Sequence, residues 1–107
     1  MATHDDALVA AVDEVLLNLD ELCRAGAVGP EWVTERVEAG LLVARRGEAR
    51  AWRFDAVALK RVRCMARLER DFDAVPELAA LVADLQTEIE HLRARLSRAG
   101  MGREGGG

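Results

Sequence analysis

Apolar residues recur at helical spacing in the first half of the chain. Leu19, Leu22 and Cys23 fall at i, i+3 and i+4, which predicts a short helix that Gly26 ends. Pro30 suits the first turn of a second helix, whose buried positions follow at every fourth residue: Val33, Val37 and Leu41. Because a glycine-containing turn, residues 25–29, joins these two short helices, the pattern predicts a helix-turn-helix.

The pattern changes between Leu42 and Phe54. Apolar residues at 42–43 and 51–54 flank a polar centre that contains Gly47, which predicts a β-hairpin with the glycine in its turn. An earlier apolar run, residues 15–17, predicts one more short strand. Asp55 is well placed as the N-cap of a third helix. The apolar positions of that helix are Ala58, Leu59, Val62, Met65, Ala66 and Leu68.

The last helical stretch, residues 76–99, carries a heptad pattern. Val82, Ile89 and Leu96 fall seven apart and interleave with a second series formed by Leu78, Leu85 and Leu92. Mostly β-branched residues at one position and leucine at the other favour a two-stranded coiled coil, and Glu88 and Arg93 would pair across a parallel interface. The alternative is that this face packs on its own domain. We predict self-association through Leu78, Val82, Leu85, Ile89, Leu92 and Leu96.

These elements fit one mainly α-helical domain within 107 residues. We predict an acidic extension over residues 1–14, a winged helix-turn-helix over 15–75 with a small hairpin as its wing, an association helix over 76–99, and a disordered glycine-rich tail over 100–107. No apolar run approaches the ~20 residues of a membrane span. The acidic N-terminus lacks the basic start of a signal peptide, so a cytoplasmic protein without membrane contact is expected, with Cys23 and Cys64 as free thiols.

Charge is unevenly distributed along the chain. Residues 1–38 carry nine acids against two bases, a net charge of −7, whereas residues 39–70 carry nine bases against three acids, a net charge of +6. Separated blocks of opposite charge indicate binding surfaces. The alternative is internal neutralisation, in which the basic segment packs against the acidic one. The candidate partner-binding residues on the acidic face are Asp20, Glu21, Glu31, Trp32, Glu35 and Glu38.

The second helix of a DNA-reading helix-turn-helix lies against phosphates and base edges. Here that helix carries three acids at i, i+4 and i+7, which would repel a polyanion and release no counterions. The wing and the third helix leave weak nucleic-acid contact open, although a solvated arginine-rich surface explains them equally well. The candidate contacts are Arg45, Arg46, Arg50, Lys60, Arg63, Arg67 and Arg70.

Signals for catalysis are missing from the sequence. His4 and His91 are the two histidines, and neither belongs to a set of residues with metal-ligand spacing. No glycine-rich phosphate loop follows a strand, and neither cysteine has a base partner nearby in sequence. We therefore expect a binding protein without enzyme activity, cofactor or metal.

The order of elements resembles the MerR-like superfamily over about residues 15–98. Within it, the runs LDELC at 19–23, EWV at 31–33, VEAGLL at 37–42, WRFD at 52–55 and IEHLRARL at 89–96 are most similar to the chaperone-modulator family, CbpM. The acidic second helix departs from DNA-reading MerR regulators, and the chain ends before the ligand or metal site that such regulators carry beyond the dimerisation helix.

The resemblance implies a homodimeric adaptor of a co-chaperone. Members of this family bind the J-domain of the curved-DNA-binding co-chaperone CbpA, block its work with the Hsp70 chaperone, and restrain its DNA binding. J-domains present a basic helix to Hsp70, which an acidic surface would occupy. Two alternatives remain open: a MerR-like transcription regulator that uses the wing and the basic residues, and a small binding protein of the antitoxin or excisionase type.

Overall fold

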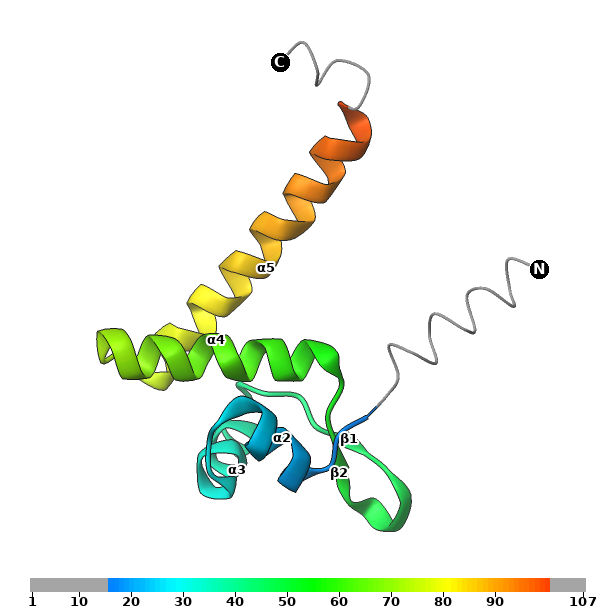
Figure 1. The fold of residues 1–107 in the computed structure, drawn as a ribbon, viewed down its shortest axis with the longest axis vertical. Coiled ribbons are helices and arrows are strands. Elements are labelled where there is room, and N and C mark those ends of the chain that lie inside the picture. Colours follow the sequence, from blue (N-terminus) through cyan, green and yellow to red (C-terminus); the bar gives the residue numbers. More distant parts are fainter. Residues whose placement is uncertain (1–15, 101–107) are drawn as a thin grey trace, which may run out of the picture.

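A computed structural model describes residues 16–100, which form helices and one small hairpin (Figure 1). The predicted order of elements and the mainly α-helical fold class are confirmed. The predicted extension, residues 1–14, and residues 101–107 of the predicted tail lie outside the described part. The elements are α2 (Leu19–Gly26), α3 (Pro30–Glu38), β1 (Arg45–Arg46), η1 (Glu48–Arg50), β2 (Trp52–Arg53), α4 (Ala56–Phe72) and α5 (Pro76–Ala99).

Helix α2 starts at a capping box that the sequence analysis did not identify. The Asn18 side chain accepts a hydrogen bond from the Glu21 amide, and the Glu21 carboxylate accepts one from the Asn18 amide, each at 2.8 Å. Gly26 is the last residue of the helix, but the left-handed residue that terminates it is Ala27, with φ 59°. Gly26 is buried, and a Cβ on it would lie 2.6 Å from Val62 Cγ1. This glycine therefore permits close contact between α2 and α4.

The wing is shorter than predicted and begins later in the chain. Strands β1 and β2 pair antiparallel, with Arg45 opposite Arg53 and Arg46 opposite Trp52. The prediction of a strand at 42–43 is wrong, because the Leu42 side chain is buried in the core and its amide bonds back to the carbonyl of Arg36. Of the short strand predicted at 15–17, Leu17 forms an antiparallel bridge with Phe54.

The core lies where α2, α3 and the wing meet α4. Its largest fully buried side chains are Leu22, Val33, Phe54, Val62 and Met65. Trp52 packs edge-on against Phe54 with ring centroids 6.2 Å apart, so the wing is attached to the helices by aromatic contact.

Helix α4 links the winged domain to α5. Asp55 caps α4 as predicted, since its carboxylate accepts a hydrogen bond from the Ala58 amide at 2.9 Å. Helix α5 packs on α4 through three buried alanines: Ala79, Ala80 and Ala83. Figure 1 shows the C-terminal half of α5 extending away from the other helices.

Candidate protein-interaction surfaces

Three carboxylates line the exposed side of α3: Glu31, Glu35 and Glu38, called here the acidic ridge. Glu31 and Glu38 form no ion pair with any residue in 16–100, and Glu35 contacts only its neighbour Arg36, at 3.5 Å. On α2, Asp20 is exposed but paired with Arg24 at 2.7 Å, and Glu21 is engaged in the capping box. The strongest uncompensated negative charge of the predicted acidic face therefore lies on α3.

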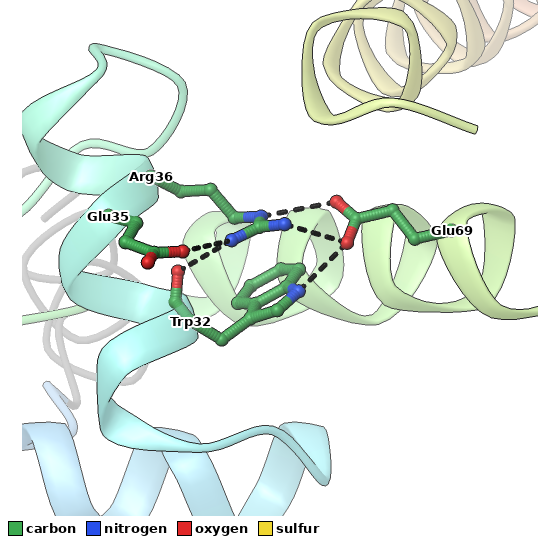
Figure 2. A network of polar contacts seen from close by, with 4 residues as sticks. All are labelled: Trp32, Glu35, Arg36 and Glu69. Atoms are coloured by element: carbon green, nitrogen blue, oxygen red, sulfur yellow. Dashed lines mark hydrogen bonds and ion pairs between the residues drawn. The ribbon is translucent and has the colours of Figure 1, made fainter. Parts of the chain in front are cut away.

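Trp32 does not stand on the exposed side of α3 as the sequence analysis expected. Its side chain is half-buried, and its indole Nε1 donates a hydrogen bond of 2.9 Å to Glu69 of α4 (Figure 2). The guanidinium of Arg36 lies 4.0 Å above the indole ring, a cation–π geometry. Trp32 is thus part of the contact between α3 and α4 and is not a free anchor for a partner.

Arg36 and Glu69 form the charged centre of the same contact. Arg36 donates from Nη2 and Nε to the two carboxylate oxygens of Glu69, at 2.7 and 3.1 Å, and from Nη1 to the carbonyl of Trp32 at 3.0 Å. The two side chains are only 8% and 17% exposed. A bidentate pair of this kind, shielded from water, fixes both the distance and the rotation of α3 on α4. The orientation of the acidic ridge depends on it.

Two bases of α4 pair with the last helix. Lys60 Nζ lies 2.6 Å from Glu90, and Arg61 forms an ion pair with Asp84. Within residues 16–100, Arg36 and Glu69 form an ion pair between the two blocks, in which the base belongs to the acidic block and the acid to the basic block. Within the described residues, Lys60 and Arg61 of the basic block therefore pair with α5, and Glu31 and Glu38 of the acidic ridge are left without an ion pair.

Several of the candidate nucleic-acid contacts have partners within the protein. Arg63 donates to the carbonyl of Ala25 and Arg46 to the carbonyl of Arg50. Arg45 pairs with Asp55, and Arg70 with Asp71, both at 3.5 Å. Arg50 and Arg67 are exposed. The basic residues are thus divided between the wing and α4, where most of them also stabilise local structure.

Helix α5 presents an apolar stripe to solvent. Leu78, Leu85, Ile89, Leu92 and Leu96 are each between 44% and 65% exposed, and Leu81, which the heptad analysis did not include, is 52% exposed. Val82 is half-buried. The helical spacing places this stripe on the side of α5 opposite the alanines that contact α4. Within the described residues, the stripe does not pack on its own domain.

The two cysteines are free thiols, as expected from the sequence. Burial, and secondarily the negative charge of Asp20, raise the pKa of the Cys23 thiol. Cys64 is half-buried, and its sulfur lies 3.2 Å from the side-chain oxygen of Gln86. Among residues 16–100 no three His, Cys, Asp or Glu side chains gather as metal ligands, and no helix there has the length and apolarity to cross a membrane.

Comparison with known proteins gives two consistent findings. The sequence profile described as MerR HTH family regulatory protein matches residues 17–99. Chaperone modulatory proteins CbpM of Coxiella burnetii, from strains Dugway 5J108-111, RSA 331 / Henzerling II and CbuG_Q212, are each 36% identical to this chain over 80 residues, which covers 75% of this chain and 76% of each relative. Both descriptions are of regulatory proteins.

Proposed function

The chain belongs to the MerR HTH regulatory family and, within it, to the chaperone modulatory proteins CbpM, and from this premise we propose that it regulates a J-domain co-chaperone. Its target is the J-domain of a curved-DNA-binding co-chaperone of the CbpA type. By occupying that domain, the protein prevents the co-chaperone from activating its Hsp70 and restrains its DNA binding. The winged helix-turn-helix acts here as a protein-binding module.

The observation that carries this proposal is the acidic ridge on α3. In a helix-turn-helix this helix would face DNA, yet here it presents Glu31, Glu35 and Glu38 to solvent. A surface of this charge repels phosphate and attracts a basic helix. A J-domain presents such a helix to Hsp70, so the ridge and the chaperone compete for one site.

Charge and apolar contacts have different roles in this competition. Complementary charge mainly raises the association rate and selects the partner, while burial of a few apolar side chains sets the lifetime of the complex. The Arg36–Glu69 pair contributes indirectly, because it holds α3 in one orientation on α4.

The protein acts as a homodimer through the stripe on α5. Burial of a large apolar side chain is worth about 1.5–3 kcal/mol when it leaves water completely. The side chains of the stripe are already about half-covered, so each contributes about 1 kcal/mol, and two helices together supply enough to exceed the cost of association. A dimer presents two acidic ridges.

The test reverses charge on the ridge without disturbing the fold. Glu31→Lys with Glu38→Lys avoids Glu35, which contacts Arg36. Lysine at the first turn of α3 is unfavourable to the helix dipole and lysine at the last position is favourable, so the two effects on stability nearly cancel. The association rate with a purified J-domain at low salt should fall about tenfold or more.

A matched control makes the same change in net charge elsewhere. The control Glu48→Lys places a new lysine on the wing, where the position is exposed, and it makes the same change in net charge as Glu31→Lys alone. This control should bind the J-domain at close to the unmodified rate. If the ridge variant and the control bind alike, the ridge is not the interface, and the basic residues of α4 become the next candidates.

A further inference from the structure

We propose that Phe72, at the corner between α4 and α5, is the apolar anchor with which this protein holds the basic helix of its partner. The inference rests on the proposed function and adds to it the residue that sets the lifetime of the complex. The sequence analysis assigned the aromatic contact to Trp32, whose indole is engaged with Glu69 and Arg36. Phe72 takes that role.

Phe72 is the most exposed aromatic side chain of the protein, at 72%. The chain contains two tryptophans and two phenylalanines, and the other three are half-buried or buried. The backbone around Phe72 is fixed, since Asp73 adopts the left-handed conformation with φ 57° and the amide of Ala74 donates to the carbonyl of Leu68. A phenylalanine side chain on a fixed backbone has only two rotatable bonds, so it loses little conformational freedom when a partner covers it.

Carboxylates lie close to Phe72 in the sequence. Asp71 and Asp73 flank Phe72 in sequence, and Glu77 follows in the first turn of α5; all three are exposed. Arg70 is close as well, but it pairs with Asp71 at 3.5 Å. Val75, 59% exposed, extends the apolar area. An apolar centre with an acidic rim fits a cationic helix that carries an apolar residue on its face.

The position of Phe72 on α4 connects it to the contact between α3 and α4. Phe72 follows Glu69 by three residues, so the two side chains are neighbours on one side of the helix. Glu69 is the residue that binds Trp32 and Arg36 of α3 (Figure 2). Phe72 therefore stands beside the contact that holds α3, and with it the acidic ridge, in one orientation on α4.

A second copy of the chain is the less favoured occupant of this corner. Two identical corners facing each other across a two-fold axis would bring Asp71, Asp73 and Glu77 against their own copies. Like charges placed together oppose association. The apolar stripe further along α5, from Leu85 to Leu96, has balanced charge, because Arg93 and Arg95 offset Glu88 and Glu90.

The test is Phe72→Ala in the full chain, with the purified J-domain as probe. We expect the dissociation constant to rise tenfold or more, mainly through faster dissociation, whereas reversal of Glu31 and Glu38 slows association. Phe72→Leu should restore most of the affinity. Val57→Ala is the matched control, because Val57 is 69% exposed at the other end of the same helix. Circular dichroism should show the same melting temperature for all three variants.

The outcomes separate this inference from the proposed function. If the unmodified protein does not bind the J-domain, the proposed function fails and the inference fails with it. If the unmodified protein binds and Phe72→Ala binds equally well, the inference alone is overturned. It is also overturned if Phe72→Ala converts a dimer to a monomer in sedimentation at unchanged J-domain affinity, because the ring then belongs to the contact between copies.

Discussion

Replacement of Glu69 by glutamine tests how firmly α3 is held on α4. The change preserves the shape of the side chain but removes the negative charge that faces Arg36. The amide oxygen can keep the two hydrogen bonds that Oε1 accepts from Trp32 Nε1 and Arg36 Nη2, but the bond that Oε2 accepts from Arg36 Nε is lost. Its NH₂ group would also face the N–H groups of Arg36. The variant therefore leaves a charged guanidinium, 8% exposed, with only the exposed Glu35 carboxylate, 3.5 Å away, as its counter-ion.

The expected loss of stability follows from this burial. Removal of one partner of a buried ion pair costs about 3–5 kcal/mol. Arg36 keeps its stacking on Trp32 and its bond to the Trp32 carbonyl, so we expect the lower part of this range or slightly less, about 2–3 kcal/mol. For a domain of this size the melting temperature should fall by about 8–20 °C.

The assay is urea denaturation followed by circular dichroism, at one protein concentration because the stability of a dimer depends on it. Asp20→Asn is the matched control, since it makes the same chemical change in the pair with Arg24, whose side chains are more than 70% exposed. That control should change the free energy of unfolding by less than about 0.5 kcal/mol. Equal effects of the two substitutions would refute the structural role given to the Arg36–Glu69 pair.

Three further predictions concern other parts of the molecule. Ile89→Asp should weaken a dimer by about 100-fold or more in sedimentation, while Ala94→Asp on the opposite side of α5 should not; an unmodified protein that stays monomeric at high micromolar concentration would contradict this. At pH 8 iodoacetamide should alkylate Cys64 before Cys23, because the raised pKa keeps the buried thiol protonated; equal rates in the folded protein would argue against that burial. Binding to DNA should be weak, indifferent to sequence and lost with added salt, and a tight specific footprint at physiological salt would favour the transcription-regulator alternative.

Local rules in the sequence were sufficient for most of the fold. Pro30 and Asp55 begin their helices as predicted, and α5 has the predicted bounds, 76–99. These features depend on backbone chemistry and spacing within a few residues. The exact start of the wing depends on tertiary packing instead. The Leu42 side chain is buried in the core, so β1 begins only at Arg45. The role of Gly26 also depends on tertiary packing, because a glycine is required there only by the close approach of Val62.

The candidate surfaces were harder to predict than the elements that carry them. Glu31 and Glu38 could be placed on an exposed side of α3 from their spacing alone. The engagement of Trp32 and Arg36 with Glu69 joins positions more than 30 residues apart, and no local pattern marks it. Phe72 was not identified as an anchor, because the exposure of its side chain at the corner between α4 and α5 depends on how these two helices pack.

The central claim is that this protein prevents a J-domain from activating its Hsp70. The most direct measurement is the ATPase rate of an Hsp70 stimulated by the purified J-domain co-chaperone, with increasing amounts of this protein added. The account predicts that stimulation falls toward the basal rate of Hsp70, and that the Glu31→Lys, Glu38→Lys variant requires much higher concentrations for the same effect. Full stimulation in the presence of excess unmodified protein would contradict it.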